Sequence, residues 1–170
     1  MRPTIIACFD VHYFDDHTNA AVVLLDKWSD ATAADQTVAR FGPANDYVAG
    51  SFYQRELEPL LKVIDRLNHN IETFVIDAYC HLSPDGEPGL GQYLHEQLPD
   101  DKLVIGVAKN RFRDTTHAVE LLRGDSIRPL FVSAIGLDYQ SAAENIKSMH
   151  GKNRFPTILK LVDQMSRDGG

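Results

Sequence analysis

Two aspartates interrupt apolar segments of this chain, and their carboxylates are candidates for chemistry. Asp10 lies within the run IIACFDV (residues 5–11), and Asp77 ends the apolar segment 73–77. A carboxylate among apolar residues must be solvated, paired or bound to a metal, because an unpaired buried charge is costly. Two carboxylates that meet on one sheet favour a cation between them, and hard oxygen ligands suit Mg²⁺ or Mn²⁺. For either acid taken alone, capping of a turn or helix beyond its strand remains the alternative.

Two further charged residues stand at positions where chemistry is possible. Lys109 directly follows the apolar run 102–108 and can offer a fixed positive charge to a phosphate or a leaving oxyanion, although a surface lysine is the simpler interpretation. Glu56 lies at the start of a predicted helix, where the helix dipole alone favours an acid. The seven histidines include no His-x-x-x-His pair, and the chain has no Gly-x-Ser-x-Gly motif. These absences disfavour zinc hydrolases and serine hydrolases.

The elements that must position these residues begin with a predicted hairpin. Segments 4–14 and 19–28 are rich in β-branched and apolar residues and are joined by a polar turn, which favours two antiparallel strands. Residues 29–46 are expected to form a loop with a short third strand. Apolar residues at steps of three and four predict a helix over 54–68.

The second part of the chain alternates between strand and helix patterns. Buried strands are expected at 73–77 and 102–108 with a helix at 92–97 between them, and strand, helix, strand in that order implies parallel pairing. A further strand at 127–134 and two C-terminal helices, 139–149 and 156–166, follow. We therefore expect an α/β fold: a mixed sheet with an N-terminal antiparallel hairpin, then parallel strands, flanked by helices. Ligands of such sheets bind beyond the carboxyl ends of strands.

Composition indicates a folded protein of about one domain. The chain has 170 residues, of which 44% are hydrophobic and 24% charged, so we expect a single domain over 1–170. Its net charge of −7 speaks against binding nucleic acid by bulk electrostatics. The charge is uneven, however. Residues 1–108 carry 7 basic and 17 acidic side chains (net −10), whereas residues 109–170 carry 10 and 7 (net +3).

The cysteines and the apolar runs bear on the expected compartment. Cys8 and Cys80 provide neither a disulfide framework nor zinc-site spacing, which fits a reducing compartment. The apolar run near the N-terminus is too short for a signal-peptide core, and no stretch is long enough to span a membrane. We therefore expect a cytoplasmic protein that has no membrane partner.

Taken in order, short motifs along nearly the whole chain resemble those of the endonuclease V family of RNase H-like nucleases. The Asp-Val-x-Tyr and Gly-Val-Ala-Lys motifs are fairly specific, and the order of all the motifs is more specific still. The motifs are FDVHY (9–13), YVAG (47–50), RE (55–56), VID (75–77), GL (89–90) with YL (93–94), IGVAK (105–109), PLFVS (129–133), RFP (154–156) and LVD (161–163).

The resemblance implies a catalytic centre that hydrolyses a phosphodiester bond in DNA or RNA close to a deaminated base, chiefly inosine. By this resemblance, Asp10, Glu56 and Asp77 bind Mg²⁺ or Mn²⁺, and Asp163 occupies a position where family members place an Asp or His near the metal. Lys109 matches the catalytic lysine of the family. A metal held by carboxylates can lower the pKa of a bound water and stabilise charge on phosphate oxygens.

The resemblance also implies residues that contact the substrate. Tyr47 corresponds to the aromatic residue that stacks at the lesion, Arg55 precedes the metal-binding glutamate, and His81 is a candidate replacement for a displaced family histidine. Ala78 and Cys80 stand where family members have glycines that make room for the flipped base. We therefore expect that side chains fill this space and that lesion specificity is altered.

Three hypotheses of function follow. The leading hypothesis is a divalent-metal-dependent endonuclease, and the alternative is a non-catalytic RNase H-like module that binds a nucleic acid or a protein. A metal-dependent hydrolase of a small phosphorylated molecule is the third, for which an acidic surface is no handicap. The oligomeric state is open.

Overall fold

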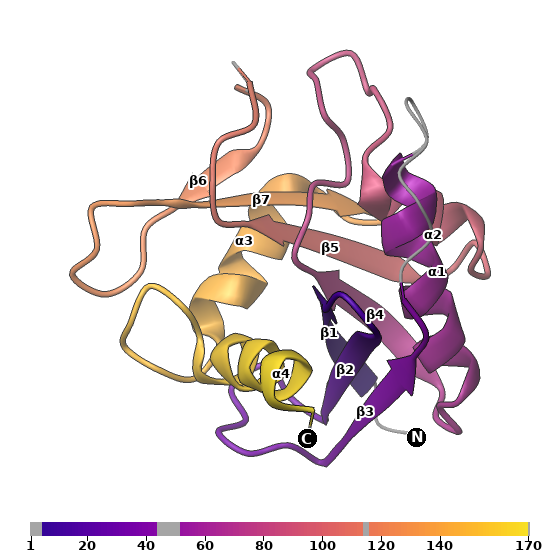
Figure 1. Ribbon diagram of the computed structural model, residues 1–170. Coiled ribbons are helices and arrows are strands. Elements are labelled where there is room, and N and C mark those ends of the chain that lie inside the picture. The colour runs from indigo at the N-terminus through magenta and orange to yellow at the C-terminus, as the bar shows by residue number, and fades with distance from the viewer. Residues whose placement is uncertain (1–4, 44–51, 114–115, 170) are drawn as a thin grey trace.

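The structure, a computed structural model, describes residues 5–43, 52–113 and 116–169. Within these residues, seven strands form one sheet in the spatial order β3-β2-β1-β4-β5-β7-β6 (Figure 1). The strands are β1 (Ile5–Tyr13), β2 (Thr18–Leu25), β3 (Asp35–Phe41), β4 (Ile71–Ile76), β5 (Leu103–Ala108), β6 (Val119–Leu121) and β7 (Leu130–Ile135).

The predicted hairpin and the parallel strands beside it are confirmed. β1 and β2 pair antiparallel, with Asp10 opposite Ala21. β1 pairs in parallel with β4, and β4 pairs in parallel with β5; Cys8 lies opposite Val75, and Val75 opposite Ile105. This register brings the ends of β4 and β5 to the level of the second half of β1.

The last two strands depart from the expected run of parallel strands. β7 runs antiparallel to β5, with Gly106 opposite Ser133, and β6, which sequence analysis did not predict, pairs antiparallel with β7. No crossover helix lies between β5 and β7 in the described residues, so the chain turns back without the connection that parallel pairing needs. β6 has only three residues, too few for a clear alternating pattern. Ile127, the expected start of the last strand, is 92% exposed.

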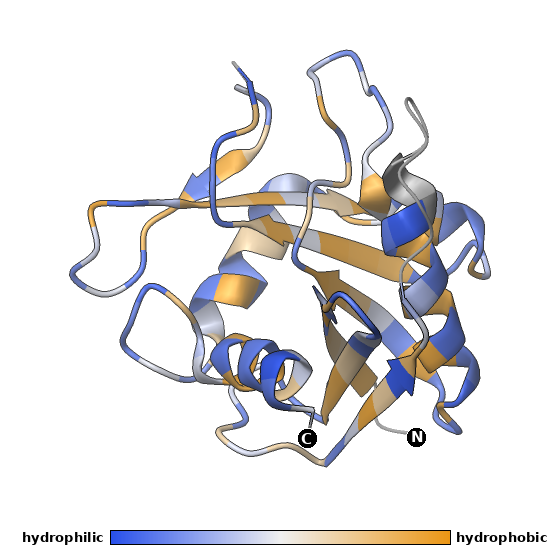
Figure 2. Ribbon diagram, viewed as in Figure 1, coloured by the Kyte–Doolittle hydropathy of each residue, from blue (hydrophilic) through white to orange (hydrophobic). Residues whose placement is uncertain are grey.

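Helices cover both faces of the sheet, α1 and α2 on one face and α3 and α4 on the other (Figure 1). Hydrophobic residues follow the central strands, and hydrophilic residues occupy much of the outer helix surface (Figure 2). Among the described residues, no helix is long and apolar enough to cross a membrane. The helices are α1 (Phe52–Asp65), α2 (Leu90–Glu96), α3 (Tyr139–Ser148) and α4 (Thr157–Asp168).

Alternating side chains of the strands build two cores. Cys8 packs with Val162 of α4 on one face, and the next residue, Phe9, packs with Leu60 of α1 on the other. All eight residues of β2 are buried, as expected for a strand inside the sheet and covered on both faces. The two helical layers therefore close over β1 from opposite sides, and side chains from both layers meet near Asp10.

Candidate active site

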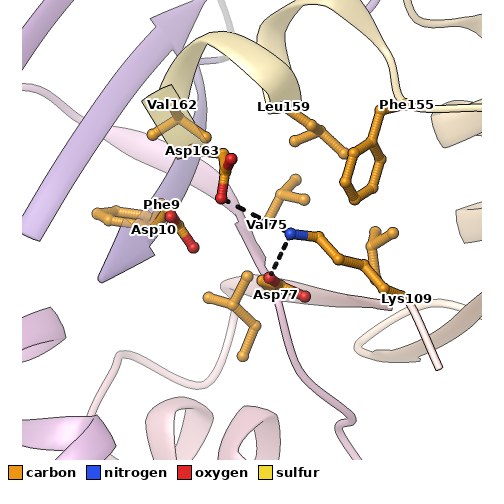
Figure 3. A pocket seen from close by; sticks show the side chains of 11 residues that line it. Phe9, Asp10, Val75, Asp77, Lys109, Phe155, Leu159, Val162 and Asp163 are labelled. Carbon is orange, nitrogen blue, oxygen red and sulfur yellow. Dashed lines mark ion pairs between the residues drawn. The ribbon is translucent and has the colours of Figure 1, made fainter. Parts of the chain in front are cut away.

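Three of the predicted site residues lie on or directly after three neighbouring parallel strands. Asp77 follows β4 directly, and Lys109 follows β5 directly. Asp10 lies within β1, two residues beyond the Cys8–Val75 pair, and is therefore level with Asp77. Asp163 of α4 reaches the same pocket from the helical layer (Figure 3). The rest of the pocket lining is apolar and consists of Phe9, Val75, Ile76, Val107, Phe155, Leu159 and Val162.

The ammonium group of Lys109 lies between two of the carboxylates. Its Nζ is 3.4 Å from Oδ2 of Asp77 and 3.6 Å from Oδ1 of Asp163 (Figure 3). The three side chains are 30%, 39% and 26% exposed, in the order Lys109, Asp77, Asp163. Partial burial raises the pKa of Asp77 above its usual range, although the nearby ammonium acts to lower it. One lysine therefore does not fully compensate the carboxylates of this pocket.

A serine in the last turn of α4 contacts the carboxylate of Asp10. The Ser166 hydroxyl lies 2.6 Å from Oδ2 of Asp10 and is positioned to donate to it. Burial raises the pKa of Asp10 to about 6, and Asp77 and Asp163 also raise it, whereas the Ser166 hydrogen bond opposes the shift. Ser166 is fully buried, and Nδ2 of Asn19 donates to its carbonyl oxygen at 3.0 Å. These contacts join the end of α4 to the N-terminal hairpin.

Glu56 faces Asp10 and Asp77 from the opposite helical layer. It lines a second hollow, which shares Asp10 and Asp77 with the first. Burial raises the pKa of Glu56; Asp77 also raises it, while the Tyr13 hydroxyl and the Arg55 guanidinium act to lower it. The two shared carboxylates therefore lie between an acid on α1 and an acid on α4.

This donor set fits a hard cation that takes only part of its shell from the protein. Within the described ranges, no three Asp, Glu, His or Cys side chains converge as a ready metal cage. Mg²⁺ commonly uses one or two carboxylates and completes its octahedron with water and phosphate oxygens. Asp10 and Asp77 are the acids common to both hollows, and both have raised pKa values. Such carboxylates gain from a nearby cation.

Comparison with known proteins identifies the family. The family model described as Endonuclease V matches residues 1–126, about three quarters of the chain. The chain belongs to the endonuclease V family. No curated protein matches it. The match includes Asp10, Glu56, Asp77 and Lys109, whereas Asp163 lies beyond it.

Solved structures of endonuclease V share this fold over almost the whole chain. The Bacillus subtilis protein is 16% identical with a TM-score of 0.77, covering 97% of this chain and 80% of its own. The Streptomyces avermitilis protein is 25% identical with a TM-score of 0.73, covering 98% and 82%. A Ciona intestinalis endonuclease V variant, solved with DNA containing an inosine, is 18% identical with a TM-score of 0.77, covering 98% and 85%. The expected α/β architecture, a mixed sheet flanked by helices, is thus confirmed.

Of the residues that the family resemblance assigns to substrate contact, the structure places one near the acids. Tyr47 lies outside the described residues. The Arg55 guanidinium carbon lies 4.7 Å from the centroid of the Tyr13 ring, beside the Glu56 hollow. His81 lines a different hollow, where its Nδ1 is 2.5 Å from the Tyr139 hydroxyl. The structure does not bring His81 together with the acids.

Cys80 does not fill the space beside the acids. Its side chain is fully buried, with Sγ 3.8 Å from the Val104 carbonyl oxygen. A Cβ on Gly91 of α2 would lie only 2.4 Å from this sulfur. Cys80 therefore packs beneath α2, and neither it nor Ala78 lines the two hollows that contain Asp10. At these two hollows the expected crowding is not found.

Sequence reasoning missed Ser166 as a functional candidate. This serine ends the predicted helix 156–166, and its distance of three residues from Asp163 puts both residues on one side of that helix. That spacing was a usable signal, since a serine on the buried side of a helix needs a hydrogen-bond partner. The partner itself, Asp10, lies 156 residues away in sequence.

We expect Ser166→Ala to raise the pKa of Asp10 further above about 6, because the variant removes the hydrogen bond that stabilises the ionised carboxylate. Carboxyl ¹³C NMR titration of metal-free protein measures this pKa directly. Ser148→Ala is the matched control, since the Ser148 hydroxyl donates to the carbonyl oxygen of Asn145 within α3. An unchanged Asp10 midpoint in Ser166→Ala would show that the hydroxyl does not act on this carboxylate.

We expect Asp10→Asn to raise the melting temperature of metal-free protein at pH 8. The folded-state pKa of about 6 lies above the value of 3.8 for a freely exposed Asp, so ionised Asp10 destabilises the fold as pH rises through this window. Asparagine removes that charge and can still accept from Ser166. The gain should shrink towards pH 4, where the carboxyl is protonated in the folded state. Thermal unfolding of both proteins in EDTA at pH 8 and pH 4 measures this gain in melting temperature. If the Asp10→Asn protein melts at or below the temperature of the parent protein at pH 8, then burial of ionised Asp10 does not destabilise the fold.

Proposed function

We propose that this chain is a divalent-metal-dependent endonuclease that hydrolyses a phosphodiester bond in DNA or RNA near a deaminated base, inosine. The observation that carries the proposal is that Asp77 and Lys109, which directly follow β4 and β5, share one pocket with Asp10 of β1 in an endonuclease V fold. The inosine-containing DNA bound to the Ciona intestinalis relative supports this substrate class.

The chemistry is divided among residues of three layers. Asp10 and Asp77 would hold Mg²⁺ or Mn²⁺ from the sheet, with Glu56 and Asp163 facing it from the two helical layers. When bound there, the ion would lower the pKa of a water molecule and offset charge on the phosphate oxygens. Lys109 presents a fixed ammonium group beside Asp77, where it can stabilise negative charge that develops on the phosphate or the leaving oxygen. A metal ligand must be deprotonated, so the raised pKa of Asp10, about 6 in the metal-free protein, predicts that the apparent affinity for Mg²⁺ falls as pH drops through the region near 6.

The test is cleavage of matched single- and double-stranded DNA and RNA oligonucleotides, each with and without one inosine. Assays in Mg²⁺, in Mn²⁺ and in EDTA establish the metal requirement, and the Asp77→Asn variant controls for contaminating nucleases. We expect metal-dependent cutting near inosine. Metal-dependent cutting without inosine preference would overturn the proposed specificity for inosine but support the proposed nuclease activity.

A non-catalytic binding module is the second candidate. The observations that favour it are the net charge of −7 and the lack of a ready metal cage among the described residues. Absence of cutting under every condition, together with retained binding of an oligonucleotide in a mobility-shift assay, would select this candidate over the nuclease. Preferential hydrolysis of a small phosphorylated compound would instead select the third hypothesis.

A further inference from the structure

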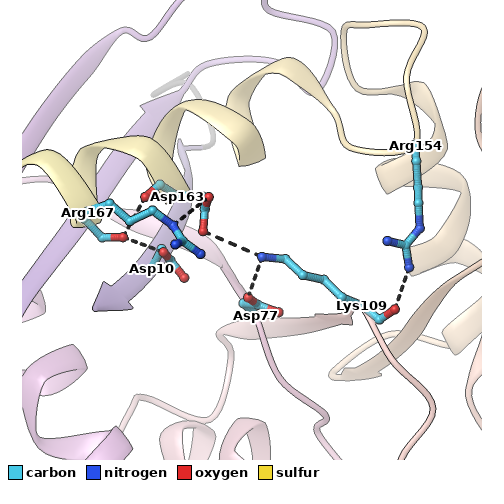
Figure 4. A network of polar contacts seen from close by, with 7 residues as sticks. Asp10, Asp77, Lys109, Arg154, Asp163 and Arg167 are labelled. Atoms are coloured by element: carbon cyan, nitrogen blue, oxygen red, sulfur yellow. Dashed lines mark hydrogen bonds and ion pairs between the residues drawn. The ribbon is translucent and has the colours of Figure 1, made fainter. Parts of the chain in front are cut away.

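Lys109 is fixed at its backbone by an arginine from the loop between α3 and α4. Nη2 of Arg154 donates to the Lys109 carbonyl oxygen at 2.5 Å (Figure 4). It also donates to the Pro129 carbonyl oxygen at 2.9 Å. Nε of the same guanidinium donates to the Arg128 carbonyl oxygen at 2.9 Å. One planar group therefore ties the residue after β5 to the two residues before β7. A lysine has no fork of donors to replace it.

The next residue in the chain contacts the other end of Lys109. The ammonium nitrogen of Lys109 lies 4.8 Å from the centroid of the Phe155 ring, within the range of a cation–π contact. Phe155 also lines the pocket that contains Asp77 and Asp163 (Figure 3). Arg154 and Phe155 thus hold the backbone and the head group of the same lysine.

The loop that presents this pair is itself fixed by a second arginine. Arg123 is 6% exposed, and its guanidinium donates to the carbonyl oxygens of Asn153 at 2.6 Å, Met149 at 2.8 Å and Gly151 at 3.0 Å. Buried bonds from a charged donor to several carbonyls are strong and leave little freedom to the loop. The segment before Arg154 is therefore set by contacts that do not involve the acids.

We propose that Arg154 and Phe155 are positioning residues for Lys109, which keep its ammonium group between Asp77 and Asp163. This inference rests on the proposed function, in which that ammonium group stabilises negative charge. Neither residue contacts the acids through a hydrogen bond or ion pair among the described residues. The contacts that each of them makes with Lys109 are therefore the route by which we infer that they act on the reaction.

The test compares Arg154→Gln and Arg154→Lys with Arg128→Gln, a control that removes a nearby exposed positive charge without removing the three carbonyl bonds. We expect kcat to fall about 10- to 100-fold in both Arg154 variants, because misplacing a catalytic group by about 1 Å has effects of this size. KM for the oligonucleotide should change less than about twofold. A rise in KM with unchanged kcat, or an equal effect of Arg128→Gln, would overturn the inference in favour of phosphate binding.

Each variant is also made in a Lys109→Met background. A residue that acts only through Lys109 should cause no further loss there, whereas a merely structural role gives the same fold-loss in both backgrounds. Phe155→Leu, which keeps an apolar side chain but removes the ring, should follow the same non-additive pattern. Additive losses would overturn the inference.

A readout that needs no cleavage separates failure of the inference from failure of the proposed function. Acylation of Lys109 by an amine reagent, followed by mass spectrometry, should be several-fold faster in Arg154→Gln than in the parent protein. Lys102, whose ammonium group donates to Asn70, serves as the internal reference. Equal acylation of Lys109 in both proteins overturns the inference, even if the parent protein cuts no oligonucleotide.

Discussion

Replacing Asp77 by Asn should lower the cleavage rate about 10³-fold, the upper end of what one electrostatic group at a reaction centre contributes. Asp77 is shared by both hollows and pairs with Lys109 at 3.4 Å. Asparagine has nearly the same size but no charge, so it weakens cation binding and leaves the ammonium group with one carboxylate partner fewer. Single-turnover cleavage with saturating enzyme measures the chemical step.

The matched control for this variant is Glu72→Gln, at the other end of the same strand. Glu72 is exposed and lies outside both hollows. The Glu72→Gln protein should cleave at the parent rate, and both variants should unfold cooperatively. An undiminished rate in Asp77→Asn would show that Asp77 has no role in cleavage. Equal losses of rate in both variants would show a general effect of lost negative charge.

Replacing Lys109 by Met should lower kcat about 10²- to 10³-fold, the range seen when one fixed charge or donor is removed from a transition state. Its ammonium group also lowers the pKa values of Asp77 and Asp10. Without it, both carboxyls should hold their protons to higher pH. The loss of activity should therefore be larger at low pH than at high pH, and the pH profile of kcat measures this difference.

Lys102→Met provides the control, because Lys102 lies just before the same strand, β5, and its ammonium group donates to the Asn70 side chain at 3.1 Å. This variant should keep the parent kcat. If both lysine variants lose activity equally and mainly through KM, then the lysines act by general attraction to nucleic acid. Lys109 would in that case have no catalytic role.

The sequence alone was enough to predict the elements whose side chains follow a local pattern. Alternating and continuous apolar runs fixed the hairpin and the strands before Asp77 and Lys109, since burial on a sheet has a period of two. Spacing by three and four fixed α1 and α4, which begin and end within a few residues of expectation. The position of an acid or a lysine at the end of a parallel strand is also a local property, so the two strand-end residues were identified before their contacts were known.

Tertiary structure alone decided which distant groups meet. No periodicity in the sequence connects the segments that meet in three places. These are the antiparallel pairing of β7 with β5, the contact of Ser166 with Asp10, and the contact of Arg154 with Lys109. The placement of His81 in a separate hollow is of the same kind. The contacts of Ser166 and Arg154 depend on how α4 and the loop before it pack across the sheet. Packing of this kind depends on the summed burial of many side chains, whereas a sequence pattern reports only the face that each element buries.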